Sequence, residues 1–407
     1  MGPARQSRKV QKMQKYLWLS QFTVLVAAFL GAGIAQAQVP ADIEAQLIKI
    51  GHIVDPACTA KVYRPLMPRN DITSKVTPLY AGITIERDVS FGPDPKDVVD
   101  IFTADKGPAS RPVLMYVPGG AGNKIEVMDK EATAFFDNIA RWAAENGMVG
   151  VLMQRHGLPP GAPPDFYAGA KDVSAMIQWV ENNISKYHGS PDRMFIWAHS
   201  AGNGPVGNYL GHPELYGPRG AGVSGVIFMS GQFGILREDG TNPVPQSAGG
   251  PGGGGANALV GAGQTCGAAG AAAGGAGGGQ GAPSAGVGAT AAPGGAAGGG
   301  GRSAAQQVPQ DEQIKRSSLP ALEKTNVKIF LASAELDPGV DGKMSPFNQA
   351  LHDELCKLDG PNAVEGKGHC PMMLFEKSES HMSEVFSIDT PDKTVSGPIL
   401  NWIRSIE

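Results

Sequence analysis

One stretch of the sequence is the strongest indication of the fold: Arg193-Met-Phe-Ile-Trp-Ala-His-Ser-Ala-Gly202. Its first half is a short apolar run, which is typical of a strand buried on both faces of a sheet. Its second half places small residues around Ser200, and a helical pattern follows near 201–210. A sharp strand-to-helix turn tolerates only small residues at these positions, and it lifts the serine hydroxyl above the sheet edge. The stretch therefore predicts an exposed serine at the carboxyl end of a buried strand.

Apolar runs and helical patterns alternate along the chain on both sides of this stretch. Strands are predicted at 83–89, 98–102, 112–117, 148–153, 193–198, 225–229, 327–332 and 372–375, and helices at 131–146, 172–180, 201–210, 346–357 and 393–405. Strands that alternate with helices predict an α/β domain whose mostly parallel sheet has helices on both faces. We assign this domain to residues 83–407, and residues 38–82 to an N-terminal segment that packs on it.

Three further motifs follow predicted strands, where the catalytic residues of parallel sheets gather. Pro118-Gly-Gly-Ala-Gly122 follows an early strand, and its glycines let backbone N–H groups approach a substrate. Asp337 follows the next-to-last strand, and His381 follows the last one. The order serine, aspartate, histidine predicts a catalytic triad.

From about Arg111 to Ile403, these motifs together resemble the α/β-hydrolase esterases. The segment Lys171–Gly202 and the sequence His381-Met-Ser-Glu-Val are most similar to the hormone-sensitive-lipase-like and acetyl/feruloyl-esterase-like branch. Two positions depart from the usual pattern. Ala198 stands where G-x-S-x-G has its first glycine, and Pro118-Gly-Gly-Ala stands where that branch has His-Gly-Gly-Gly, so the usual histidine anchor of the loop is missing.

The resemblance implies a role for each site residue. Ser200 is the nucleophile, His381 is the general base and later the acid, and Asp337 orients His381. The oxyanion hole then consists of backbone N–H groups of Gly120, Ala121 and Ala201. Phe166 and Tyr167 lie in a Pro-rich loop above the sheet, where they either line the substrate pocket or anchor the loop.

Other residues compete for these roles. His352 lies within a predicted helix and is expected to be an ordinary surface residue, whereas His369 precedes the last strand instead of following it. Glu335 is expected within its strand, and Asp341 lies beyond a Pro-Gly turn. His199 is expected to be structural. We therefore keep Asp337 and His381.

The sequence predicts neither a cofactor nor a metal. Gly202–Gly207 matches G-x-G-x-x-G, but no acidic residue follows about 20 positions later, as a dinucleotide site requires. We expect its glycines to serve close helix packing. The four cysteines show no C-x-x-C spacing, and no H-x-x-x-H is present, which argues against zinc. Cys356 and Cys370 either form a disulfide or remain free.

The N-terminus predicts export. Residues 1–37 combine five basic residues and no acidic ones with an apolar stretch and Ala35-Gln-Ala37, as in a signal peptide cut after Ala37. The alternative is an uncleaved membrane anchor. The whole chain has a net charge of −4, so removal of these 37 residues leaves −9, which argues against nucleic acid or anionic lipid as a partner. We expect a periplasmic or extracellular protein.

A Gly-rich tract interrupts the domain. Residues 249–301 contain 24 of the 57 glycines and no charged residue, and we expect a disordered insertion over 240–310. From the serine, aspartate and histidine motifs, the predicted function is hydrolysis of small carboxylic esters through an acyl-enzyme. Because such an insertion gives no hydrophobic cover, we expect short or polar esters to be preferred over long-chain lipids. The alternatives are a serine peptidase of the same fold and a non-catalytic binding protein. The oligomeric state and the ester's acyl and alcohol groups stay open.

Overall fold

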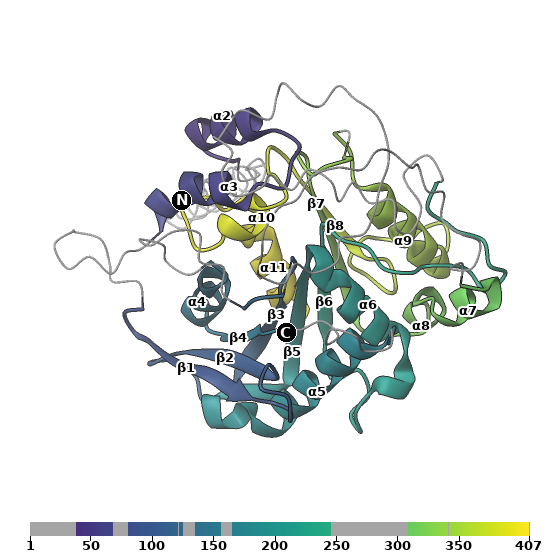
Figure 1. The fold of residues 1–407 in the computed structure, drawn as a ribbon, viewed down its shortest axis with the longest axis horizontal. Helices are drawn as coiled ribbons and strands as arrows, with labels where there is room; N and C mark the ends of the chain where they lie inside the picture. Colours follow the sequence, from purple (N-terminus) through teal and green to yellow (C-terminus); the bar gives the residue numbers. More distant parts are fainter. Residues whose placement is uncertain are drawn as a thin grey trace, which may run out of the picture. The chain divides into compact units, whose positions relative to one another are not determined.

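Eight strands form one twisted sheet in the computed structural model of the chain (Figure 1). Their bounds are β1 Ile83–Ser90, β2 Val98–Ala104, β3 Arg111–Val117, β4 Val149–Met153, β5 Gly189–His199, β6 Gly225–Met229, β7 Lys328–Ala334 and β8 Met372–Glu376. The spatial order is β1-β2-β4-β3-β5-β6-β7-β8. The pairs β1–β2 and β2–β4 are antiparallel and the other five are parallel, so every predicted strand and the mostly parallel sheet are confirmed.

The structure describes residues 38–67, 80–120, 122–124, 135–155, 165–245, 308–340 and 342–406. The chain divides into two compact units, 1–38 and 39–407, and the description that follows concerns the second. The predicted signal peptide and most of the Gly-rich tract lie outside the described residues.

Side chains of the central strands alternate between two apolar layers. On β5, Phe195 and Trp197 belong to one buried cluster, and Met194, Ile196 and Ala198 belong to the other. This alternation follows from the two-residue period of a strand. Because both faces are covered, the central strands carry apolar residues at nearly every position, which is what made them recognisable in the sequence.

Helices cover both faces of the sheet (Figure 1). Residues of α2, α3, α4, α10 and α11 pack in the first cluster, and residues of α5, α6, α8 and α9 pack in the second. The helices are α2 Ala41–Ile50, α3 Pro56–Tyr63, α4 Asp137–Glu145, α5 Ala168–Asn183, α6 Asn203–Gly211, α7 Gln310–Lys315, α8 Leu319–Leu322, α9 Pro346–Cys356, α10 Ser383–Phe386 and α11 Ser396–Ile406. The helices α2, α3, α7, α8 and α10 were not predicted. The last three have fewer than two turns and therefore give no clear periodicity.

The N-terminal segment contacts the loops that follow β7 and β8. The hydroxyl of Tyr63, at the end of α3, lies 3.3 Å from Glu379 and 3.1 Å from Asp392. The imidazole of His52 lies 3.4 Å from the carbonyl oxygen of Asp337. At the start of α3, Asp55 accepts a hydrogen bond of 2.9 Å from the backbone N–H of Cys58, as an N-cap residue does.

Cys356 and Cys370 form a disulfide, which resolves the alternative that the sequence left open. The bond joins the last residue of α9 to the chain just before β8.

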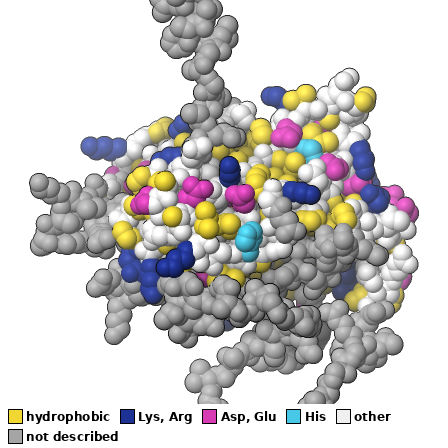
Figure 2. All heavy atoms as spheres, turned by 90° about the horizontal axis from the view of Figure 1, so that it is seen from above, with side chains coloured by type: hydrophobic (Ala, Val, Ile, Leu, Met, Phe, Trp, Pro, Cys, Tyr) yellow, Lys and Arg dark blue, Asp and Glu magenta, His cyan; other side chains and the backbone are white. Residues whose placement is uncertain are grey.

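None of the helices in the described part of the chain has the length and apolar character of a membrane span. Acidic and basic side chains both occur on the face seen in Figure 2, among apolar and uncharged atoms.

Candidate active site

Ser200 occupies a sharp turn between a strand and a helix. β5 ends at His199, a 3₁₀ turn covers Ser200–Gly202, and α6 begins at the next residue. The φ of Ser200 is +53°, a left-handed conformation that is uncommon for a residue with a side chain. Such strain in a non-glycine residue is typical of a functional position.

Small neighbours are required around this turn, as the sequence predicted. A Cβ atom on Gly202 would lie 2.4 Å from the carbonyl oxygen of Val117, and one on Gly119 would lie 2.6 Å from the Cβ of Ser200. Both distances are far below van der Waals contact, so any larger residue would displace the turn. The turn is therefore locked against the end of β3.

The structure brings Ser200, His381 and Asp337 together. Nε2 of His381 lies 2.8 Å from Oγ of Ser200, and Nδ1 lies 2.8 Å from Oδ1 of Asp337. His381 and Asp337 are 8% and 9% exposed, so water has little access to this chain of contacts. With the carboxyl accepting from Nδ1–H, Nε2 is free to accept the serine proton. The arrangement has the geometry of a nucleophile, a base and an orienting acid.

Pro118, Gly119 and Gly120 lie beside the serine turn. Gly120 has a φ of +50°, which a glycine adopts without strain, and a Cβ there would meet no atom within 4 Å. The backbone is therefore open at the position where the sequence predicts an oxyanion donor. Ala121, the second predicted donor of this loop, lies outside the described residues, and the third, Ala201, directly follows the serine.

Arg155 holds this loop from behind, a contact that sequence reasoning missed. Its Nε donates to the carbonyl oxygen of Pro118 at 3.1 Å, and its Nη2 lies 3.4 Å from the carbonyl oxygen of Gly119 and 2.6 Å from that of Gly120. Its own backbone N–H donates to the carbonyl oxygen of Gly122 at 2.8 Å. Burial lowers the pKa of the guanidinium.

The guanidinium therefore anchors the loop in place of the histidine that the resembled esterases have at the position of Pro118. An arginine presents several donors in a rigid plane, which suits a row of neighbouring carbonyls. A carbonyl that points at Arg155 turns the following N–H the other way, because the peptide unit is planar. The sequence signal was a charged residue two positions after an apolar strand.

The sheet topology, the turn at Ser200 and the chain order of the three site residues together identify the fold. A mostly parallel sheet carries a serine on a strained strand-to-helix turn, and the aspartate and histidine follow later strands in the order Ser, Asp, His. The chain has the α/β-hydrolase fold.

Known proteins with sequence similarity are carboxylesterases. Venom carboxylesterase-6 of Apis mellifera is 32% identical over 122 residues, which are 29% of this chain and 21% of that protein. A probable isoprenylcysteine alpha-carbonyl methylesterase of Arabidopsis thaliana is 26% identical over 121 residues, 29% of this chain and 23% of that protein. The match thus spans about a fifth to a quarter of the length of these relatives. No family model matches the chain.

Solved esterases cover most of the chain at low similarity. A bacterial heroin esterase is 12% identical with a TM-score of 0.46, over 90% of this chain and 96% of that one. A carboxyl esterase from the mycorrhizal fungus Tuber melanosporum has the same identity and TM-score, over 84% and 90% of the two chains.

On the histidine side of this α/β-hydrolase fold, His199 packs against His381. Their ring centroids lie 4.8 Å apart, and Nε2 of His199 lies 2.9 Å from the carbonyl oxygen of His381. Burial, with a smaller contribution from His381, lowers the pKa of His199 well below its usual value. A neutral His199 therefore donates to the backbone of His381, consistent with the structural role expected for it.

Three buried glutamic acids lie behind the triad. Glu376, Glu379 and Glu384 are each fully buried, and Oε1 of Glu384 lies 3.4 Å from Nε2 of His199. Burial raises the pKa of Glu376 to about 8 and that of Glu379 and Glu384 well above the usual range. Their carboxyl groups are therefore protonated near neutral pH. No sequence pattern indicated that these glutamic acids are buried.

The competing residues that the structure describes contact other groups. Glu335 is not within its strand, because β7 ends at Ala334, and its carboxyl accepts from the backbone N–H of Ser378 at 2.8 Å. His352 is not a surface residue, since its side chain is only 14% exposed and faces the disulfide. His369 precedes β8 and contacts Asp359. Asp341 lies outside the described residues.

Phe166 lines a small cavity and Tyr167 does not line it. The cavity has a volume of about 160 Å³ and includes Phe233, Phe347 and Arg316 in its wall. The Tyr167 ring packs on His212 at 4.7 Å. Of the two uses that the sequence left open, Phe166 fits a pocket wall and Tyr167 fits a loop anchor.

The chain after β6 links this cavity to the serine turn in sequence. A Cβ on Gly231 would lie 2.3 Å from the carbonyl oxygen of Ser200, and the next residue, Gln232, is part of the cavity wall. A larger cavity of about 480 Å³ lies at the opposite edge, around the amino ends of β5, β6 and β7. Among the described residues, the walls of both cavities lack Ser200, Asp337 and His381, and the small cavity is the one whose wall is linked to the serine turn, through Gly231 and Gln232.

The glycines of the G-x-G-x-x-G match serve packing at two of three positions. A Cβ on Gly202 would meet Val117, and one on Gly207 would lie 2.3 Å from the ring of Phe233. Around Gly204 nothing lies within 4 Å. Close packing explains the first and the last glycine, and no structural reason is evident for the middle one.

Proposed function

We propose that the chain is an exported serine carboxylic-ester hydrolase that acts on small esters through an acyl-enzyme. The observation that carries the proposal is the continuous contact from Ser200 through His381 to Asp337, with both hydrogen bonds at 2.8 Å. The similarity to carboxylesterases supports the reaction class. The strained φ of Ser200 supports a catalytic use, because a serine that merely caps a helix needs no strain.

The first half of the reaction acylates Ser200. Nε2 of His381 takes the hydroxyl proton while Oγ bonds to the ester carbonyl carbon. The tetrahedral intermediate collapses as the bond to the alcohol oxygen breaks, and His381 returns the proton to that oxygen. In the second half, water repeats the same sequence on the acyl-enzyme and releases the acid.

The negative oxygen of each tetrahedral intermediate needs donors that are already in place. The backbone N–H groups of Gly120, Ala121 and Ala201 would supply them, and one such donor is typically worth about 3 kcal/mol of transition-state stabilisation. Arg155 acts as a positioning residue, because it binds the carbonyl groups of the loop and not the substrate. By this reasoning the loop functions without the usual histidine.

A small substrate is supported by the cavity whose wall includes Gln232 and Phe166. The cavity lined by Phe166 holds about 160 Å³, enough for a short acyl or alcohol group and below the usual range for a drug-sized ligand. The Gly-rich tract has few large apolar residues besides Leu259 and Val260. We therefore propose that activity falls from acetyl and butyryl esters to long-chain esters. A rise with chain length would contradict this.

Export rests on the N-terminal sequence and is supported by the Cys356–Cys370 disulfide. Disulfides persist mainly in oxidising compartments such as the periplasm and the cell exterior. Fractionation of a producing cell, with N-terminal sequencing of the exported chain, tests this. Export predicts a chain that begins at Gln38.

The enzymatic proposal is tested with Ser200→Ala and simple aryl acetates. We expect hydrolysis to fall to the background of the uncatalysed reaction, because no other oxygen lies at the position of Oγ. Ser185→Ala is the matched control, since this serine is exposed in the turn after α5, and it should keep full activity. Retained activity in Ser200→Ala would show that another residue is the nucleophile.

A further inference from the structure

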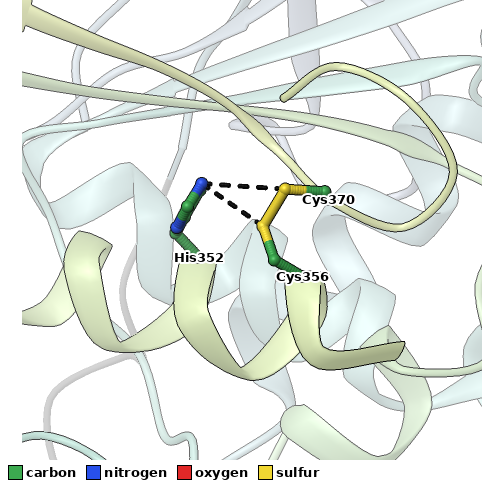
Figure 3. Close-up of side chains that lie close together, drawn as sticks. All are labelled: His352, Cys356 and Cys370. Atoms are coloured by element: carbon green, nitrogen blue, oxygen red, sulfur yellow. Dashed lines mark hydrogen bonds between the residues drawn. A yellow bond between two sulfur atoms is a disulfide. The ribbon is translucent and has the colours of Figure 1, made fainter. Parts of the chain in front are cut away.

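His352, Cys356 and Cys370 form a second cluster of chemically reactive side chains, outside the proposed active site (Figure 3). His352 and Cys356 lie one turn apart on α9, so both side chains share one face of the helix. The loop after α9 returns Cys370 to the same place. Nε2 of His352 lies 3.3 Å from Sγ of Cys356 and 3.7 Å from Sγ of Cys370.

The other ring nitrogen of His352 is already engaged. Nδ1 lies 3.1 Å from Oδ1 of Asp353, so in the neutral ring the carboxylate holds the proton on Nδ1. The lone pair of Nε2 then faces the two sulfur atoms. A carboxylate on the far nitrogen is the usual arrangement for a metal-binding histidine, because it fixes the tautomer and makes the ligand nitrogen more basic.

The distances also suit a metal ion. A tetrahedral zinc ion with bonds of about 2.0 Å to nitrogen and 2.3 Å to sulfur separates the two ligand atoms by about 3.5 Å. The two nitrogen–sulfur distances, 3.3 and 3.7 Å, lie on either side of this value. Only the two sulfurs must move, because they are bonded to each other in the oxidised chain.

We propose that this cluster is a zinc site of the reduced protein, with His352, Cys356 and Cys370 as ligands. A dithiol reductant converts the disulfide to two thiols and is itself oxidised to a disulfide. Zn²⁺ then displaces one proton from each thiol and binds both thiolates and Nε2 of His352. Glu365 supplies the nearest carboxylate for the fourth position, 3.8 Å from the same Nε2, or water fills it.

The site would keep α9 tied to β8 in both redox states. The disulfide makes this link in the oxidised chain, and zinc would make it after reduction. β8 leads to the loop that carries His381, so the link also bears on the proposed active site. Zinc binding itself does not depend on the proposed esterase activity.

The test uses the full-length chain, reduced under anaerobic conditions and freed of reductant, with Co²⁺ as a coloured substitute for Zn²⁺. We expect one Co²⁺ per chain, with the absorption of a tetrahedral ion and of thiolate-to-cobalt charge transfer, and displacement by Zn²⁺. The oxidised chain should show neither band. A reduced chain that gives no thiolate–cobalt absorption would overturn the proposal.

Two histidine variants make the test specific. His352→Ala should weaken Co²⁺ binding at least about tenfold. His369→Ala is the matched control, because His369 lies in the same loop as Cys370 but contacts Asp359. This variant should bind Co²⁺ as tightly as the unmodified chain does. Equal binding by the His352 and His369 variants would overturn the assignment.

Alkylation distinguishes the cysteines, including Cys58, which is also disulfide-bonded in the oxidised chain. Zn²⁺ should protect Cys356 and Cys370 from an alkylating reagent, as read from the modified peptides, and leave Cys58 unprotected. Protection of Cys58 alone would place the metal elsewhere. This readout does not require the variants to fold, because it uses the unmodified sequence.

Discussion

The two sides of Ser200 are built from opposite kinds of residue. On the proposed oxyanion side, one half-buried arginine binds consecutive carbonyl groups of the loop after β3. On the histidine side, His381 contacts Asp337 and His199, with buried glutamic acids behind them. The first side uses a cation to orient backbone groups, and the second uses acids around an imidazole.

The two sides would carry opposite charges during the proposed reaction. In the proposed mechanism, the tetrahedral intermediate would develop negative charge toward the loop, while His381 would become positive. The buried glutamic acids behind it have raised pKa values, so they fill space near the imidazole mostly as neutral groups. Asp337 is thus the carboxyl that contacts the catalytic ring. Each side has one group whose loss should be costly, Arg155 or Asp337.

The largest effect is expected on the histidine side. Asp337→Asn should lower kcat/KM for an aryl acetate by about 10⁴-fold, because the amide no longer holds the proton on Nδ1 of His381. Asp311→Asn, at an exposed position on α7, is the control and should leave the rate unchanged. A loss below tenfold in the Asp337 variant would mean that another carboxyl orients His381.

The oxyanion side should be next in size. Arg155→Ala should lower kcat by about 10²- to 10³-fold with a small change in KM, because the loop donors lose their orientation mainly toward the transition state. Added guanidinium ion should restore part of the rate, and Arg155→Lys should lie between the two. If the variant loses binding and kcat together, with no rescue, the arginine is structural only.

A smaller effect is expected at His199. His199→Phe keeps an aromatic ring beside His381 and removes the hydrogen bond to its carbonyl oxygen. One hydrogen bond is worth about 0.5–1.5 kcal/mol, so kcat should fall about two- to tenfold. The pH profile of kcat should shift as well, since the rings are in contact. An unchanged profile and rate would assign His199 to packing alone.

The smallest effect on activity, but a distinct one on stability, is expected at Glu376. Its pKa is 4.5 in the unfolded chain and about 8 in the folded one. Between these values the folded state binds more protons, so the free energy of unfolding falls as the pH rises through this window.

Glu376→Gln should reduce this fall, because glutamine stays neutral at every pH. The measurement is urea unfolding of both chains between pH 5 and 9. Parallel curves for the two chains would mean that Glu376 titrates normally.

The sequence was informative where one residue type satisfies one strict requirement. Gly119 and Gly202 have no room for a side chain, and Ser200, Asp337 and His381 each follow a strand, so local patterns were sufficient to find them. Central strands were equally clear because both faces are buried.

What the sequence could not show depends on contacts between distant residues. Arg155 and the loop it holds are more than 30 positions apart, and Glu376, Glu379 and Glu384 look like ordinary surface residues until the N-terminal segment and the last helices cover them. His352 was wrongly expected at the surface for the same reason. Burial of polar groups is decided by tertiary packing, which periodicity does not encode.

Covalent labelling tests the role of Ser200 as the nucleophile together with the role of Arg155. The unmodified chain and Arg155→Ala are treated with a fluorophosphonate, and the adduct is located and timed by peptide mass spectrometry. We predict one adduct, on Ser200, that forms about 10²-fold more slowly in the arginine variant, because the phosphonate oxygen uses the same donors as the tetrahedral intermediate. No adduct on Ser200 would contradict the assignment of the nucleophile, and equal rates in the two chains would contradict the role of Arg155.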